Sequence, residues 1–506
     1  MVEVMDTTLR DGEQTSGVSF NETEKLAIAK LLLEDIKVNR IEIASARVSE
    51  GERKAVIRIT DWAQKHGYID RVEILGFVDG TASLQWIQEA GGKVVNLLTK
   101  GSLKHVTGQL RKTPEQHLAD IHRSIEEAGR RGITVNVYLE DWSNGMISSP
   151  DYVYLLVDGI MSKGVKRIML PDTLGILNPE QTYGFCKAMT DKYPDLHFDF
   201  HSHNDYDFAV ANAFAAFRAG VKGVHTTVNG LGERAGNAPL ASIVGMLNDH
   251  LKLKNTLVEN KLNQVSKMVE LFSGIRIPTN KPLTGEYVFT QTCGVHADGD
   301  SKDNLYFNAL LPERFGRNRR YALGKTSGKA NIAKNLEELG IELSPEELAK
   351  VTQRVIELGD KKEAVTTEDL PYIISDVLKS EAIEQRITLA NYSLTLAKGL
   401  KPVVSLILQI NGNQYPETAQ GDGQYDAFMK ALWKIYDRLG KKHPLLTDYQ
   451  VSIPPGGKTD ALVETVIEWT MEGHPPFKTR GLDADQTEAA IKATVKMLNI
   501  LEGKKS

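Results

Sequence analysis

The 506-residue chain has the composition of a soluble globular protein, with 41% hydrophobic and 25% charged residues. A net charge of −5 argues against nucleic acid as a partner, and no apolar run approaches the ~20 residues that cross a bilayer. The two cysteines, and an N-terminus without a targeting pattern, predict a cytoplasmic protein. At this length about two or three domains are expected.

Short strand-like runs alternate with amphipathic helical stretches through the first half of the chain. Helical patterns occur, for example, at 21–36 and 113–132. Eight β units about 30 residues apart, each followed by a helix, predict a (β/α)8 TIM barrel over residues 1–275. An open, doubly wound sheet would use the same alternation, but eight regular units favour closure. The expected strands are 2–9, 40–45, 71–78, 94–100, 134–141, 167–173, 197–203 and 223–229.

The pattern changes after the barrel. A stretch rich in turns and polar groups, up to about residue 300, reads as a connector, and residues 326–382 read as helices. Together they form an expected linker region, 276–385. Residues 386–506 predict an α+β domain whose default role is regulation or assembly. Its expected elements are strands at 386–397, 402–412, 446–454 and 461–471, and helices at 425–440 and 486–502.

Two histidines separated by one residue end the seventh expected strand. Because side chains alternate along a strand, His201 and His203 share a face, as two imidazole ligands of one divalent cation would. Such a pair can equally be two ordinary polar residues at a strand end. Asp11 leaves the first strand and Asn237 follows the last, at the rim where TIM barrels place their active sites. The four residues predict a mixed nitrogen and oxygen metal site.

Other polar residues leave the same expected strand ends. Arg10 could offer a fixed cation to a developing oxyanion, or form a solvated pair with its neighbour. Tyr138 and Glu140 share a face, and the carboxylate could act as general base or serve a structural hydrogen bond. Thr173 could bind a carboxylate or cap the next helix. Each of these residues therefore has a functional and a structural interpretation.

Four motifs, in order along the chain, closely resemble the isopropylmalate, homocitrate and citramalate synthase family. They are TTLRDGEQT, HSHND, NGLGERAGN and GVHADGD, and GDGQYDAF resembles that family's allosteric domain. The resemblance spans nearly the whole chain. It implies a Claisen-type condensation of acetyl-CoA with a 2-oxo acid, followed by hydrolysis of the thioester.

The resemblance also implies roles for single residues. Asp11, His201, His203 and Asn237 match the ligands of a divalent ion such as Mn²⁺, Zn²⁺ or Mg²⁺. Arg10 would stabilise charge on the ketone oxygen, and Glu140 matches a glutamate implicated in proton transfer. His296 and Tyr306, which alone read as surface residues, match residues that reach the barrel of a partner subunit. A homodimer is therefore implied.

The expected pocket walls favour one branch of the family. Leucine-pathway synthases usually carry a histidine and a small residue where this chain has Leu98 and Tyr138, and homocitrate synthases need a polar group that Leu75 and Leu98 do not supply. The resemblance to the citramalate branch implies (R)-citramalate synthesis from pyruvate, with isoleucine as inhibitor. The alternatives are 2-isopropylmalate synthesis from 2-oxoisovalerate, a metal-dependent aldolase or lyase, and a catalytically inactive amino-acid sensor.

Overall fold

The computed structural model describes residues 1–506 except 301, 361–364, 379–385, 454–461 and 504–506. The chain divides into two compact units. The first comprises residues 1–290 and 304–320, and the second comprises residues 291–303 and 321–506. No helix among the described residues is both long and apolar enough to span a membrane.

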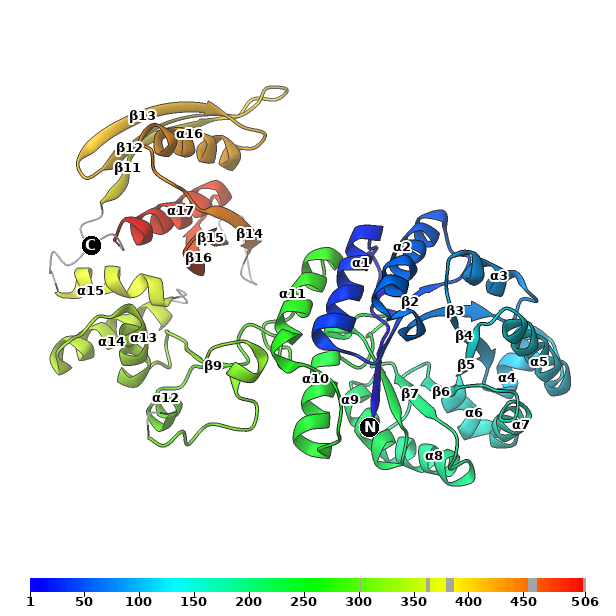
Figure 1. The fold of residues 1–506 in the computed structure, drawn as a ribbon. Helices are drawn as coiled ribbons and strands as arrows, with labels where there is room; N and C mark the ends of the chain where they lie inside the picture. Colours follow the sequence, from blue (N-terminus) through cyan, green and yellow to red (C-terminus); the bar gives the residue numbers. More distant parts are fainter. Residues whose placement is uncertain (301, 361–364, 379–385, 454–461, 504–506) are drawn as a thin grey trace. The chain divides into compact units, whose positions relative to one another are not determined.

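The first unit is a closed barrel of eight parallel strands in sequence order, with β1 paired to β8 (Figure 1). This confirms the predicted TIM barrel. Its strands are β1 (Glu3–Asp6), β2 (Arg40–Ser45), β3 (Val72–Phe77), β4 (Val94–Lys100), β5 (Thr134–Glu140), β6 (Arg167–Asp172), β7 (Phe198–Ser202) and β8 (Gly223–Thr226).

Helices follow the strands and cover the outside of the barrel (Figure 1). They are α1 (Glu22–Lys30), α2 (Glu50–His66), α3 (Ala82–Glu89), α4 (Leu103–His105), α5 (Pro114–Arg130), α6 (Trp142–Ser148), α7 (Pro150–Ile160), α8 (Pro179–Lys192), α9 (Ala209–Arg218), α10 (Leu240–Met246) and α11 (Leu262–Ser273).

Capping boxes fix where three of these helices begin. Asn21, Thr113 and Asn178 each accept a hydrogen bond from the backbone N–H of the third residue of the helix. The side chain of that third residue in turn accepts a hydrogen bond from the backbone N–H of the cap residue. Proline follows the cap in α5 and α8, where its missing N–H costs nothing. Local sequence alone therefore sets these helix starts.

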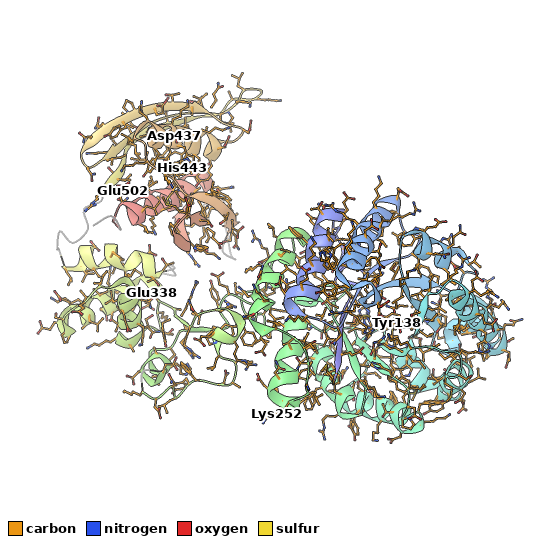
Figure 2. All side chains as sticks on the ribbon, viewed as in Figure 1. Tyr138, Lys252, Glu338, Asp437, His443 and Glu502 are labelled. Carbon is orange, nitrogen blue, oxygen red and sulfur yellow. The ribbon has the colours of Figure 1, made fainter. Side chains whose placement is uncertain are left out.

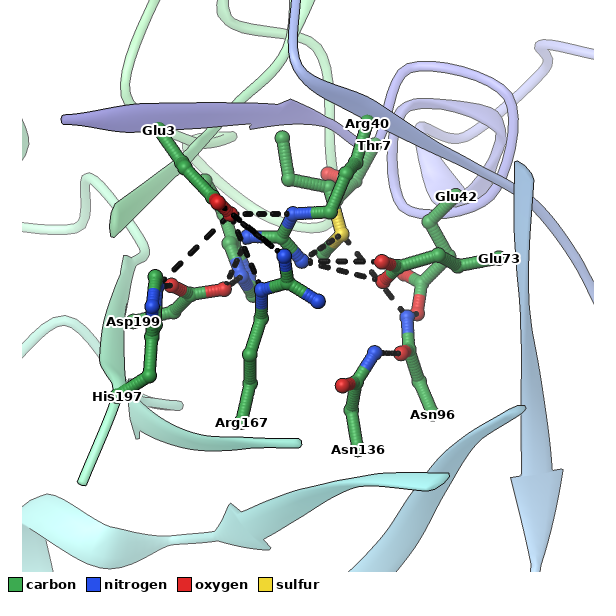
Figure 3. A network of polar contacts seen from close by, with 12 residues as sticks. Glu3, Thr7, Arg40, Glu42, Glu73, Asn96, Asn136, Arg167, His197 and Asp199 are labelled. Atoms are coloured by element: carbon green, nitrogen blue, oxygen red, sulfur yellow. Dashed lines mark hydrogen bonds and ion pairs between the residues drawn. The ribbon is translucent and has the colours of Figure 1, made fainter. Parts of the chain in front are cut away.

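Ion pairs fill the end of the barrel where the strands begin (Figure 3). Arg40 is 3% exposed and pairs with Glu3, Glu73 and Asp199, and Arg167 also pairs with Glu3. Each buried charge meets at least one opposite charge, which offsets the cost of removing it from water. In TIM barrels this end serves stability, whereas the active site lies at the other end.

The described residues of the second unit form two sheets of three antiparallel strands. Their apolar faces and the helices α16 and α17 share one core, which includes Ile435, Trp469 and Met497. The elements are α12 (Gly294–Asp300), α13 (Lys329–Leu339), α14 (Pro345–Asp360), α15 (Leu370–Leu378), β11 (Ile387–Thr395), β12 (Val403–Ile410), β13 (Asn413–Gln420), α16 (Gln424–Arg438), β14 (Leu445–Ser452), β15 (Val463–Met471), β16 (His474–Asp483) and α17 (Gln486–Gly503). Strands β9 (Thr290–Gln291) and β10 (Arg320–Tyr321) form a separate short ladder.

Several expected elements need correction. The sequence analysis missed β13 and β16, which are polar edge strands without a continuous apolar pattern. The expected connector contains the helix α12 over GVHADGD. The strands predicted at 2–9 and 223–229 end early, at Asp6 and Thr226, because a turn follows the first and a short 3-10 helix, Val228–Gly230, follows the second. The predicted boundary at 385 and the strand ends at 454 and 461 lie outside the described residues.

Gly223, the first residue of β8, leaves room for a buried carboxylate. A Cβ at this position would lie 1.9 Å from Oδ1 of Asp199. We therefore expect Gly223→Ala to lower the free energy of unfolding by about 1–3 kcal/mol, through overpacking and a displaced charge. Thermal unfolding followed by circular dichroism measures this. Gly184→Ala is the matched control because its Cβ would meet no atom within 4 Å; equal loss in both variants would contradict the prediction.

Candidate metal centre at the carboxyl ends of the strands

Asp11, His201 and His203 lie together, buried, at the end of the barrel where the strands finish. One ligand atom from each lies within 4.8 Å of the others. Nε2 of His201 is 3.3 Å, and Nε2 of His203 is 3.9 Å, from Oδ2 of Asp11. His203 lies one residue beyond β7, and its backbone pairs with that of Asn237 in an antiparallel bridge. The fold thus brings all four predicted ligands to one region.

Charge states within this cluster suit a cation. Burial raises the pKa of the Asp11 carboxyl, but Arg10 and the two imidazoles outweigh burial and hold that pKa well below its usual range. Burial lowers the pKa of His203 to about 4 and also lowers the pKa of His201. One carboxylate and two neutral imidazoles are the protonation states that metal ligands need.

Buried polar atoms without partners test whether these residues fit a metal ion. Oδ1 of Asp11, Oδ1 of Asn237, and Nδ1 of His201 and of His203 have no hydrogen-bond partner among the described residues. Buried polar atoms normally have hydrogen-bond partners, because a buried polar atom without a hydrogen bond costs free energy. A divalent ion with mixed nitrogen and oxygen ligands would supply partners for the two oxygens, and Nε2 of both imidazoles faces the carboxylate of Asp11, so the donor set fits.

The loop NGLGERAGN holds Asn237 by close backbone packing. Gly236 adopts a positive φ of 82°, and a Cβ there would lie 1.9 Å from the carbonyl oxygen of Gly230. The amide of Asn237 donates to the carbonyl of Leu231, which directs its oxygen away from that contact. Thr15 exchanges hydrogen bonds with the backbone of Gly232, which ties this loop to the loop after β1.

The guanidinium of Arg10 contacts three side chains, and only 10% of the Arg10 side chain is exposed. Its Nε donates to Glu42 at 2.5 Å, Nη1 donates to Asp11 at 3.1 Å, and Nη2 lies 3.5 Å from the hydroxyl of Tyr138. Glu42 is fully buried and also accepts from Asn96. The interpretation of Arg10 and Asp11 as a solvated pair is therefore wrong.

Glu42 and His225 were not among the residues predicted for the site. Glu42 alternates with isoleucines in RIEIAS, and a lone acid on the inner face of a barrel strand is the signal that could have identified it. His225 lies on β8, is 1% exposed, and contacts the hydroxyl of Tyr138 through Nδ1 at 3.0 Å. Tyr138 lies inside the ring of strands (Figure 2).

Apolar side chains lie beside these charges, inside the barrel. Met5, Leu75, Tyr138 and Met169 are buried in one cluster, with Leu98 partly buried against it. The cation of Arg10 lies 5.9 Å from the centre of the Tyr138 ring. Leu75, Leu98 and Tyr138, the predicted apolar pocket walls, therefore pack in one cluster next to Arg10.

The remaining candidates have other surroundings. Glu140 pairs with Lys100 at the ends of β5 and β4. The hydroxyl of Thr173 accepts from the backbone of Asp141 at 2.9 Å, and the next helix, α8, is capped by Asn178, so the capping alternative for Thr173 is wrong.

His296 and Tyr306 lie on different sides of the division between the two units. His296 lies in α12, within the second unit, and Tyr306 lies in the first unit with 41% of its surface exposed. Their roles in a partner subunit's barrel stay predictions.

Comparison with known proteins agrees with this organisation. Residues 1–269 match the HMGL-like family model, 283–363 the homocitrate synthase post-HMGL domain-like model, and 364–502 the LeuA allosteric (dimerisation) domain. An (R)-citramalate synthase of Methanocaldococcus jannaschii is 33% identical over 99% of both chains. A 2-isopropylmalate synthase of the same organism is 32% identical over 100% of this chain and 95% of its own.

Metal binding by the purified chain tests the candidate centre. After chelation and reloading with Mn²⁺, we expect a single tightly bound ion, and Asp11→Asn or His203→Ala should weaken binding by more than ~100-fold because each removes a ligand. Equilibrium dialysis with elemental analysis measures the affinity. His250→Ala serves as control, since His250 is exposed. Unchanged affinity in the Asp11 and His203 variants would refute this assignment.

Proposed function

The chain belongs to the HMGL-like family of acetyl-CoA-dependent citramalate and isopropylmalate synthases, which are transferases, and we propose that it condenses acetyl-CoA with pyruvate to give (R)-citramalate and free CoA. In this reaction a proton leaves the acetyl methyl group, and the methyl carbon bonds to C2 of pyruvate. The ketone oxygen becomes the hydroxyl, and water then cleaves the thioester.

The apolar cluster beside Arg10 is the observation that carries the choice of pyruvate. Leu75, Leu98 and Tyr138 offer a small apolar wall suited to a methyl group. They offer no cation or amide for a second carboxylate. Because one or two methylenes change binding by only about 1–3 kcal/mol, 2-oxobutanoate should also react.

The residues of the site have separate proposed tasks. Asp11, His201, His203 and Asn237 would hold a divalent ion, which when bound supplies a Lewis acid for the ketone and carboxylate oxygens of the 2-oxo acid. Arg10 faces the same region and stabilises the negative charge that develops on the ketone oxygen. Glu140, held by Lys100, moves a proton during condensation, and Thr173 contacts the substrate carboxylate.

Turnover on a panel of 2-oxo acids tests the proposed substrate. We expect kcat/KM for pyruvate to exceed that for 2-oxoisovalerate by at least tenfold, because a branched side chain is too large for the space beside Leu75, Leu98 and Tyr138. Release of the CoA thiol, followed with a thiol reagent, measures the rate. A preference for 2-oxoisovalerate would move the protein to the second candidate, a 2-isopropylmalate synthase like its relative in Methanocaldococcus jannaschii.

The match to the LeuA allosteric (dimerisation) domain supports a dimer with feedback control. We propose isoleucine as the inhibitor, bound by residues 386–506, with residues 1–275 as the catalytic domain and 276–385 as the linker region. In the dimer, His296 and Tyr306 complete the partner's barrel. The LeuA match also weighs against a simple aldolase or lyase, and family membership weighs against an inactive sensor.

Mixed dimers test the sharing of residues between subunits. Asp11→Asn and His296→Ala should each be inactive alone. When the two variants are co-expressed, about a quarter of the wild-type activity should return, because half of the dimers are mixed and each mixed dimer holds one intact site. Absence of any recovery in a sample shown by mass spectrometry to contain mixed dimers would place His296 in its own subunit's site.

A further inference from the structure

A hydrogen-bonded chain links the ionic end of the barrel to the candidate pocket. Asp199, which pairs with Arg40, lies with its Oδ2 3.2 Å from Nε2 of His225. Nδ1 of His225 lies 3.0 Å from the hydroxyl of Tyr138, and that hydroxyl lies 3.5 Å from Nη2 of Arg10. Asp199 and His225 are at most 1% exposed, so water does not compete for these contacts.

The two ends of this chain fix the direction of every bond in it. Arg10 can only donate, and the carboxylate of Asp199, paired with Arg40, can only accept. The hydroxyl oxygen of Tyr138 therefore accepts from Arg10, and its single hydrogen must go to Nδ1 of His225. Nε2 of His225 then carries the ring hydrogen and donates it to Asp199. The opposite direction would leave the hydroxyl hydrogen of Tyr138 without an acceptor and would turn an unprotonated Nε2 of His225 toward the carboxylate of Asp199.

The aromatic rings add a steric constraint. The rings of Tyr138 and His225 meet edge to face, with centres 5.5 Å apart, and the ring of His201 meets Tyr138 on another side at 6.1 Å. The ring that forms the pocket wall is therefore held both by packing and by its hydroxyl.

We propose that His225 is a positioning residue: it accepts the Tyr138 hydroxyl hydrogen, so that Tyr138 presents only an acceptor to Arg10 and closes the substrate pocket in one orientation. This inference rests on the proposed function, in which Arg10 and Tyr138 contact the 2-oxo acid. Arg10 then has its three nitrogens directed to Glu42, Asp11 and Tyr138 before substrate binds. Such preorganisation lowers the cost of binding and of stabilising the oxyanion.

The tautomer of His225 provides a test that uses no substrate. Nitrogen-15 NMR of protein labelled at histidine distinguishes a hydrogen on Nδ1 from one on Nε2, and the signal that disappears in His225→Asn identifies the residue. We expect a neutral ring with hydrogen on Nε2. Hydrogen on Nδ1, or on both nitrogens, would overturn the inference whatever the enzyme's substrate is.

Kinetics test the effect on the pocket. His225→Leu and Tyr138→Phe should each raise KM for the best 2-oxo acid acceptor by about tenfold, the size of one lost buried hydrogen bond. The double variant should be no worse than either single one, because both remove the same interaction. His225→Asn, which keeps an acceptor near the position of Nδ1, should recover most of the affinity. Effects that multiply in the double variant would indicate a general structural role and overturn the proposal.

The matched control is the other histidine on the same carboxylate. His197 contacts Oδ1 of Asp199 at 2.9 Å, is 22% exposed, and among the described residues forms no hydrogen bond or ring contact with Tyr138. His197→Gln should leave KM within about twofold of wild type while changing stability. If His197→Gln raises KM as much as His225→Leu does, the effect passes through Asp199 alone and His225 does not position Tyr138. If no 2-oxo acid reacts at all, the proposed function fails, while the tautomer still decides the assignment of His225.

Discussion

The enclosed pair of Arg10 and Asp11 is the interaction on which the rest of the site depends. Adjacent residues in the turn after strand β1 supply a cation and an anion to the same space. Burial alone would favour the neutral form of Asp11, and the guanidinium beside it raises the stability of the carboxylate instead. The anion in turn suits a metal ion, whereas the cation suits the oxygens of a substrate. Both require that Glu42 and Tyr138 hold the guanidinium away from solvent.

Regular alternation made the barrel predictable from sequence. Strands and helices there follow apolar periods and capping residues, which are local signals. The clustering of the candidate ligands Asp11, His201 and His203 could also be predicted, because parallel strands bring their carboxyl ends to one rim. Glu42 and His225 were not, because their partners Arg10 and Tyr138 lie 32 and 87 residues away in sequence. Only the closed fold shows that these side chains meet.

The second unit shows a different limit of sequence reasoning. Its central strands β12 and β15 bury alternate side chains and follow a visible period. Strands β13 and β16 lie at sheet edges, carry mostly polar residues and take part in the same sheets through backbone hydrogen bonds. Backbone pairing depends little on side-chain identity, so such strands leave a weak trace in sequence. Likewise, α12 gains its helical form without the apolar repeat that would announce it.

The polar column that runs from Arg40 through Asp199 and His225 to Tyr138 has a consequence for how this protein can evolve. Each residue of the column forms a hydrogen bond with the next one. Replacing one residue therefore leaves a buried polar group of its neighbour without a hydrogen-bond partner. The shape of this region can then change most readily through side chains outside the column, such as Leu75 and Leu98, which reach it through packing alone. Substitutions at those leucines should therefore be tolerated more readily than substitutions that remove a hydrogen-bonding group from the column.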